Sequence, residues 1–454
     1  MTKKSMTLPA MVAGALGVGA AGSVAWGAEP TTDELRQQIE QLRAKVQQLE
    51  TNQQQALNSK DVDATVERVL RDAEKRSQLM QLEGFTAGYD NGFKIRSADG
   101  NFLINPYFQF QFRNVTNFTD SPAVFDSDDD VIGFSDDEKI QNGFEVRRMK
   151  FGFRGNAFTP DLTYNFKWET AENGGGVTLE DATVQYQFSD NMAVRAGQWK
   201  DDWTHEETTS SSRQLAADRS LLNELLGGGI TDYVQGVMLV YNPPDSGWRA
   251  NLGYHDGANT DNTDWQENGG GTSVTGGPNF GVSGRVEYKV MGDWKSYDDF
   301  TSLHNKDALL VVGAGVDFTQ AGDDNIWFHT VDVQWESSGG LSLYGAYVAN
   351  WADIEPDDSY NWGALGQVGY LFNESTEVFG RVDFTKFDFD TATGDDNFWE
   401  ATVGVNYYWY AHAAKFTLDL TWLFDGSPTN VTGIGVLASD DDEFVLRAQF
   451  QLLL

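Results

Sequence analysis

Residues 102–113 read FLINPYFQFQFR, a stretch in which apolar and polar side chains alternate. One face carries Phe102, Ile104, Phe108, Phe110 and Phe112, and the other carries Asn105, Tyr107, Gln109, Gln111 and Arg113. A period of two residues indicates a β-strand with one apolar face. Residues 162–169 and 415–424 repeat the pattern, with Trp168 and Trp422 among their apolar side chains.

Three features of residues 84–454 favour a membrane barrel over another half-buried sheet. Aromatic residues gather at strand ends, the strands are about ten residues long, and short polar linkers alternate with long acidic ones. Sixteen strands are expected near 102–115, 144–155, 161–171, 178–188, 192–200, 231–242, 248–255, 279–290, 308–319, 326–336, 341–351, 361–371, 376–388, 398–409, 413–424 and 443–454, with a short extra piece at 92–97. The sequence therefore predicts an all-β fold, a transmembrane antiparallel β-barrel of about 16 strands with a water-filled lumen. A secreted soluble β-sandwich or β-solenoid is the alternative.

The first 83 residues differ in composition from the rest. Residues 1–28 have a basic start at Lys3 and Lys4, a short apolar run and small residues near 25–28, as in a cleaved signal peptide. Residues 29–83 include a heptad-like series, which is Leu35, Ile39, Leu42, Val46 and Leu49. This series predicts a short periplasmic coiled coil that joins copies of the chain, or else a lone amphipathic helix.

Charge and residue usage exclude several functions. The formal net charge of -36 opposes nucleic acid as a partner, because phosphates would be repelled. The chain has no Cys, and its five His residues show no recognisable metal-ligand spacing. We therefore expect no enzyme activity, no catalytic residue, no metal site and no cofactor.

The strand EVRRMKFGFRG, residues 145–155, gathers bases in this acidic chain. The apolar parity changes at Arg147 and Arg148, which predicts a β-bulge that turns both arginines away from lipid. Lys150 and Arg154 are then expected to point inward too, because a base facing lipid at mid-depth costs about 2–4 kcal/mol. Either these bases line the pore, or they only pair with lumen acids such as Glu145 and Glu169.

The long linker after Lys200 is the second candidate site. Residues 195–229 contain Ser and Thr residues, a helical stripe and a terminal Gly227–Gly229 run. A loop this long between barrel strands is usually functional, and one that folds inward would narrow the pore. Its candidate residues are Glu207, Thr209, Ser210, Ser211 and Arg219. The alternative is an external surface loop.

A series of blocks resembles the phosphate-selective porin O and P family. They are NGFKIRSADGNF, VRRMKFGFRG, GGGVTLEDATVQY, VRAGQWK, EETTSSS and DRSLLNELL, in matching order over about residues 84–454. The resemblance implies a trimeric, sixteen-stranded outer-membrane channel with a basic constriction that binds phosphate or other anions. Arg147 and Arg148 match the paired arginines of that constriction, and Lys200 matches a basic position before the inserted loop.

The expected function is passive diffusion of small hydrophilic solutes through a diderm outer membrane, with a preference for anions such as phosphate. Arg147, Arg148, Lys150, Arg154, Lys200 and Arg113 are expected to set the charge preference. The expected partners are outer-membrane lipid, small inorganic anions or other small solutes, two further copies in a homotrimer, and the cell wall through the coiled coil. Two alternatives stay open: a general or cation-leaning porin of the same build, and a structural tether between outer membrane and cell wall.

Overall fold

A computed structural model describes residues 32–57, 67–71, 84–90, 92–125, 131–170, 175–258, 260, 262, 280–303, 305–354, 357–389, 391 and 393–454. The predicted signal peptide, residues 1–28, lies outside them. The chain divides into two units, Met1–Leu79 and Met80–Leu454. In the first unit, helix α1 spans Thr32–Leu57 over 26 residues. No helix in the described part of the chain has the length and apolar character needed to cross a membrane.

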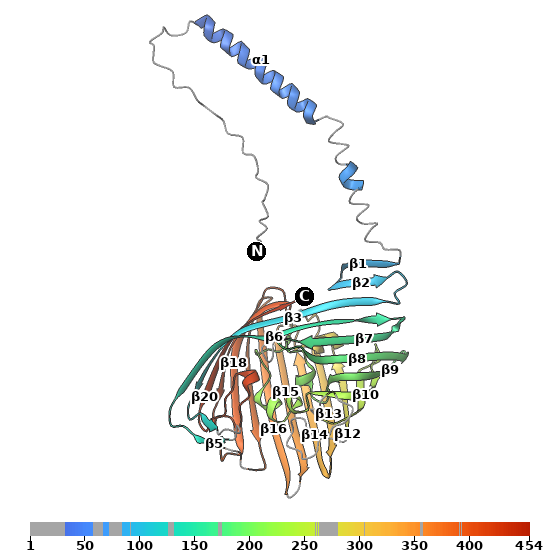
Figure 1. Cartoon of the computed structure of the whole chain (residues 1–454), viewed down its shortest axis with the longest axis vertical. Coiled ribbons are helices and arrows are strands. Elements are labelled where there is room, and N and C mark those ends of the chain that lie inside the picture. Colours follow the sequence, from blue (N-terminus) through green and yellow to red (C-terminus); the bar gives the residue numbers. More distant parts are fainter. Residues whose placement is uncertain are drawn as a thin grey trace, which may run out of the picture. The chain divides into compact units, whose positions relative to one another are not determined.

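The second unit is built on one sheet of eighteen antiparallel strands (Figure 1). Its strands are β1 (Phe85–Tyr89), β2 (Phe93–Ser97), β3 (Leu103–Thr119), β6 (Lys139–Ala157), β7 (Thr159–Glu169), β8 (Thr178–Ser189), β9 (Met192–Lys200), β10 (Tyr233–Tyr241), β11 (Trp248–His255), β12 (Phe280–Met291), β13 (Leu309–Ala321), β14 (Asp324–Glu336), β15 (Leu341–Ile354), β16 (Asp357–Asn373), β17 (Thr376–Lys386), β18 (Asn397–Tyr408), β19 (Ala414–Leu423) and β20 (Glu443–Leu453). The β1–β2 hairpin extends from one end of β3, and the other sixteen strands close into a barrel where β20 pairs with β3. All sixteen strands expected from the alternation are present, so the prediction of the barrel is confirmed.

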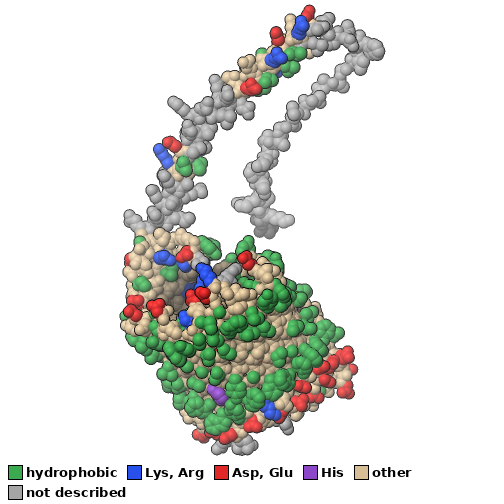
Figure 2. All heavy atoms as spheres, turned by 180° about the vertical axis from the view of Figure 1, so that it is seen from behind, with side chains coloured by type: hydrophobic (Ala, Val, Ile, Leu, Met, Phe, Trp, Pro, Cys, Tyr) green, Lys and Arg blue, Asp and Glu red, His purple; other side chains and the backbone are tan. Residues whose placement is uncertain are grey.

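The barrel wall has an apolar outer face and a polar inner face. On β17, Val382 is 46% exposed on the outside, whereas its neighbours Arg381 and Asp383 are each 2% exposed on the inside. Figure 2 shows hydrophobic side chains gathered on the outer surface and acidic side chains toward both ends of the barrel. This is the distribution that lipid requires, because an outward charge at mid-depth would be costly.

The linkers distinguish the two ends of the barrel. At one end, here the turn end, most strands are joined by a few residues, such as 190–191 and 374–375. The other end, the loop end, carries the linkers 201–232, 256–279 and 424–442, and the small hairpin of β4 (Ala123–Phe125) and β5 (Val131–Phe134). The linker 292–308 breaks the rule, because it is long yet belongs to the turn end. It contains the 3-10 helix η2 (Trp294–Asp298).

The predicted bulge in β6 is confirmed. Gln111 of β3 pairs with Arg148 and Phe112 pairs with Val146, so Arg147 is the extra residue. The shift places Arg148 and Lys150 on the inner face, where they are 6% and 8% exposed, while Met149 is 38% exposed outside. A one-residue bulge thus turns two bases into the lumen without disturbing the apolar outer surface.

Candidate functional site

The linker between β9 and β10, residues 201–232, folds into the barrel, and we call it the inner loop. It contains three short helices, α3 (His205–Thr208), α4 (Leu221–Leu225) and α5 (Gly228–Thr231). Ser220 caps α4 by accepting a hydrogen bond from the Asn223 backbone N–H at 3.1 Å. Most side chains of the loop are buried, which argues against the alternative of an external surface loop.

The barrel wall holds the backbone of the inner loop with charged side chains. Carboxylates of Asp419, Glu400 and Asp383 accept hydrogen bonds from the backbone N–H groups of residues 217, 221 and 222, at 2.7, 2.9 and 3.1 Å. Arg381 donates to the carbonyl oxygens of residues 218 and 219, and Lys415 donates to that of residue 214. These charged side chains of the wall therefore hold the inner loop in place.

Three of the predicted pore arginines converge on one carboxylate of the inner loop. Asp218 forms an ion pair with Arg113, and its Oδ1 lies 3.3 Å from Arg147 Nε and 3.1 Å from Arg148 Nη2. Arg113 also pairs with Glu145. Burial would raise the pKa of Asp218, but the three guanidinium groups outweigh it and hold that pKa well below its usual range. Asp218 is therefore an ionised anchor between the loop and strands β3 and β6.

The other predicted bases lie apart from the ion pairs around Asp218. Lys150 pairs with Glu169 at 3.0 Å and with Glu180. Lys200 pairs with Glu207 of the inner loop and lies 3.7 Å from Asp232. Arg154 is away from both groups, with its guanidinium 5.3 Å from the centre of the Tyr107 ring.

The predicted loop residues are mostly engaged within the lumen. Arg219 donates to backbone carbonyls of residues 206, 207 and 209 and pairs with Glu207 at 3.1 Å. Burial would raise the pKa of Glu207, but Arg219 and Lys200 lower it to about 2. Thr209 is buried, Ser211 accepts a hydrogen bond from Gln109 of the wall at 3.0 Å, and Ser210 lines the open part of the lumen.

The turn-end linker 292–308 meets the inner loop inside the barrel. The rings of His205 and Tyr297 stack in parallel planes with their centres 3.9 Å apart, and Phe300 packs on the edge of His205. Arg285 donates two hydrogen bonds of 2.8 Å to Asp332 and one of 3.0 Å to the Tyr297 hydroxyl. Two loops from opposite ends thus make contact in the lumen.

Among the cavities that stay open in the described part of the lumen are two beside the inner loop. The larger, of about 420 Å³, is lined by five bases and four acids, Arg195, Lys200, Arg213, Arg249, Arg285, Asp181, Asp202, Glu287 and Asp298. The smaller, of about 210 Å³, is lined by five bases and five acids, Arg147, Arg148, Lys150, Lys200, Arg219, Glu169, Glu180, Glu207, Glu224 and Asp232. The whole chain has 32 bases against 68 acids, so bases are enriched at these cavities.

Four arginines of the larger cavity were not predicted from the sequence, namely Arg195, Arg213, Arg249 and Arg285. Arg213 and Arg285 form ion pairs with Asp298 and Asp332, and Arg195 and Arg249 differ from them. Arg195 donates to Gln185 at 3.2 Å, and the Arg249 guanidinium lies 4.1 Å from the centre of the Trp294 ring. Within the described residues, neither has a carboxylate at ion-pair distance, and the Arg249 Nε is buried without a hydrogen-bond partner. Alternation along residues 248–255 could have placed Arg249 inside, with Trp248 and Leu252 on the lipid face.

One acid of the smaller cavity is set to titrate near neutrality. Burial and the nearby Glu207 raise the pKa of Glu224 to about 7. The charge of this cavity therefore depends on pH in the physiological range.

Comparisons with known proteins agree with this architecture. The family model "Phosphate-selective porin O and P" matches residues 123–349. An anion-selective porin from Comamonas acidovorans is similar in structure, with 14% identity, a TM-score of 0.52, and coverage of 77% of this chain and 99% of that chain. The channel DcaP of Acinetobacter baumannii is 15% identical, covers 80% of this chain and 99% of its own, and has a TM-score of 0.46.

OprB of Pseudomonas putida is 11% identical, with a TM-score of 0.48 and coverage of 77% of this chain and 94% of its own. No curated protein sequence matches the chain. The likeness to the Comamonas porin shows the fold, and the family model spans half of the 454 residues. The chain belongs to the phosphate-selective porin O and P family.

Proposed function

We propose that the chain is a diffusion channel with a preference for small anions such as phosphate. Family and fold make it an outer-membrane channel. The observation that carries the anion preference is the pair Arg195 and Arg249, which face the larger cavity without a carboxylate partner among the described residues. Guanidinium groups suit phosphate because their planar fork donates two parallel hydrogen bonds.

The acidic composition does not by itself set the selectivity, because exposed acids outside the lumen contribute little to the potential inside it. Figure 2 shows many exposed acids toward the ends of the barrel, whereas the larger cavity inside is lined by five bases and four acids. Exposed charges more than about 8–10 Å from an ion are largely screened at physiological salt. Charges that line a narrow pore act at shorter range, so the cavity should dominate selectivity.

We assign a different role to Arg113, Arg147 and Arg148. Their shared ion pairs with Asp218 hold the inner loop against β3 and β6, and so set the width of the pathway. Their charge contributes less to the preference for anions, because Asp218 and Glu145 offset it. Lys150 and Lys200 are offset in the same way by Glu169, Glu180 and Glu207.

The test is the double variant Arg195→Gln/Arg249→Gln in a planar bilayer under a KCl gradient. We expect the reversal potential to move toward cation preference, with little change in single-channel conductance. Arg96→Gln is a matched control, because Arg96 belongs to the exposed hairpin of β1 and β2 and lies 4.0 Å from Asp90. An unchanged reversal potential in the double variant would refute the role of the two arginines.

We also propose that the working form is a trimer with α1 in the periplasm. Ile39, Leu42, Val46 and Leu49 of α1 are 50–64% exposed, and this heptad-spaced face would be covered in a coiled coil between copies. Strand β3 begins at the turn end, and the short turns of outer-membrane barrels face the periplasm. Chemical crosslinking of the chain with and without residues 33–57 tests this role, since shortened chains that stay trimeric would rule α1 out as a requirement.

A further inference from the structure

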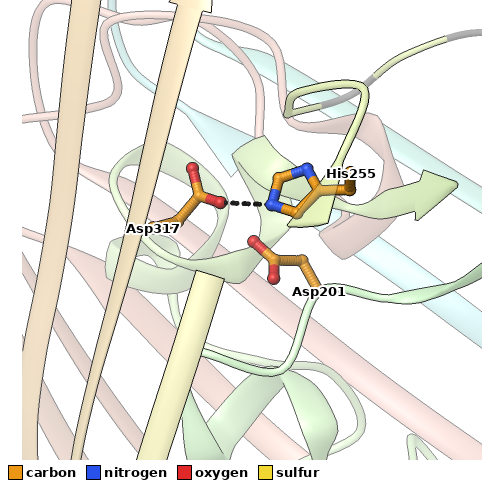
Figure 3. A group of neighbouring side chains, drawn as sticks. All are labelled: Asp201, His255 and Asp317. Atoms are coloured by element: carbon orange, nitrogen blue, oxygen red, sulfur yellow. Dashed lines mark ion pairs between the residues drawn. The ribbon is translucent and has the colours of Figure 1, made fainter. Parts of the chain in front are cut away.

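Behind the first residues of the inner loop lies a closed cluster of three ionisable side chains (Figure 3). Asp201 is the first residue of the loop, His255 ends β11, and Asp317 belongs to β13. Each is at most 1% exposed, and one ligand atom from each lies within 4.8 Å of the others. Figure 3 shows the Asp201 carboxylate directed toward the His255 ring and Asp317.

Several polar atoms of this cluster have no partner. Both carboxylate oxygens of Asp201 are buried without a hydrogen-bond partner in the described part of the chain, whereas His255 Nε2 and Asp317 Oδ2 form an ion pair at 2.9 Å (Figure 3). The hydroxyl of Ser283 is also buried without a partner, and Ser283 is paired with Asp317 across β12 and β13. Buried polar groups are normally satisfied, so the unpartnered carboxylate of Asp201 beside this ion pair points to a missing ligand.

The surrounding residues hold the cluster rigidly. Thr319 donates to the other oxygen of Asp317 at 2.9 Å, and its own hydroxyl accepts from the Ala258 backbone N–H at 3.0 Å. The His255 ring lies against Gly281, where a Cβ would come within 2.2 Å of the ring. The cluster therefore has the orienting second layer that metal ligands usually have.

We propose that Asp201, His255 and Asp317 bind a divalent transition-metal ion such as Zn²⁺. One imidazole and two carboxylates are a common ligand set for Zn²⁺, and two ionised carboxylates would neutralise its charge. The Ser283 hydroxyl or a water molecule would supply the fourth ligand. The ion would fasten the start of the inner loop to β11 and β13, on the side of the barrel away from the Asp218 anchor.

Binding of the metal ion requires two local changes in the cluster. Ligands at the usual Zn–N and Zn–O distances lie about 3.3–3.5 Å apart in a tetrahedron, so His255 Nε2 and Asp317 Oδ2 must separate by a few tenths of an ångström. His255 Nδ1 accepts a hydrogen bond from the Gly257 backbone N–H at 3.1 Å. A neutral imidazole bound through Nε2 carries its proton on Nδ1, so the Gly257 amide must turn away when the metal binds.

The test is a calorimetric titration of the purified full-length protein with Zn²⁺ after treatment with EDTA and removal of the chelator. We expect one tight equivalent per chain in the wild type, weakened by about 10- to 100-fold or more in Asp201→Asn and His255→Gln. His329→Gln is the matched control, because His329 is on β14 outside the cluster and bonds to Tyr360. Titration with Co²⁺ gives a second readout, since its visible spectrum reports an imidazole ligand in a low-coordinate site.

Asp201→Asn decides the question even if His255→Gln does not fold. Asp201 makes no side-chain hydrogen bond that the amide would lose, so this variant should fold, as its heat-dependent gel mobility would show. Tight Zn²⁺ binding that survives in folded Asp201→Asn would belong to the acidic loops and would overturn the proposal. Wild-type protein that binds no tight equivalent would overturn it too, and would leave water or a shared proton as the occupant.

Discussion

Asp218→Asn is the change that most directly perturbs the anchor of the inner loop. The side chain is fully buried and contacts Arg113, Arg147 and Arg148. Asparagine preserves the size of the side chain but removes its charge. Three guanidinium groups are then left to repel one another around a neutral amide.

The distances give the size of the effect. At 3.1 Å, the pair of Arg148 and Asp218 is worth about 5 kcal/mol at an effective dielectric constant of about 20. The cost of removing the ions from water offsets part of this attraction, and loss of one partner of a buried pair typically costs about 3–5 kcal/mol. Since about 1.4 kcal/mol corresponds to a tenfold change, opening of the loop should become about two to three and a half orders of magnitude more frequent.

Amide hydrogen exchange measures that opening. The backbone N–H groups of residues 217, 221 and 222 bond to wall carboxylates and are released only when the loop detaches. Their exchange should accelerate by the factor above, while amides of β13 and β14 stay protected. Asp396→Asn is the control, because it removes a half-exposed pair with Lys386 that is worth less than about 1 kcal/mol. Exchange at 217, 221 and 222 within about threefold of the wild type would refute the anchoring role of Asp218.

Three further changes test other parts of the account. Gly315→Ala would place a Cβ 1.9 Å from the Trp203 carbonyl oxygen, push the start of the inner loop into the lumen and lower single-channel conductance, at a stability cost of about 1–3 kcal/mol. Because the pKa of Glu224 is raised to about 7, its carboxylate is neutral below that pH, and reversal potentials should show stronger anion preference at pH 5 than at pH 8. Ile39→Asp/Val46→Asp would place charges on the heptad face of α1 and should reduce crosslinked trimers without altering the conductance of single channels.

Each of these changes has its own control. Gly366→Ala meets no atom within 4 Å, so it should leave conductance unchanged, and a loss equal to that of Gly315→Ala would contradict the steric explanation. Glu224→Gln should abolish the pH dependence of selectivity, and a persistent dependence would assign it to another group. For α1, substitution of the exposed Glu50 by Gln should not affect crosslinking.

The strands and their inner faces were predictable because lipid imposes a strict alternation on every one of them. Even the bulge at Arg147 followed from a change of parity, since a continuous strand would have put a charge into lipid. The inward path of residues 201–232 was expected from its length and from the family resemblance. Its anchors were not, because Asp218, Asp383, Glu400 and Asp419 lie far apart in the chain and meet only when the barrel closes.

The functional residues were harder to predict than the wall. The paired bases of residues 145–155 attract notice in the sequence, yet most of them have carboxylate partners in the lumen. Arg195 and Arg249 are single bases in ordinary strands, and the lack of a carboxylate at ion-pair distance among the described residues is visible only in three dimensions. The cluster of Asp201, His255 and Asp317 has no sequence spacing to reveal it, because each ligand comes from a different strand or loop.

The most direct test of the account is the reversal potential of the purified wild-type protein in a planar bilayer under a KCl gradient, repeated with phosphate added. We predict anion selectivity, with phosphate reducing the chloride current as it occupies the arginines of the larger cavity. Cation selectivity that phosphate does not alter would contradict it, because the lumen acids would then outweigh Arg195 and Arg249.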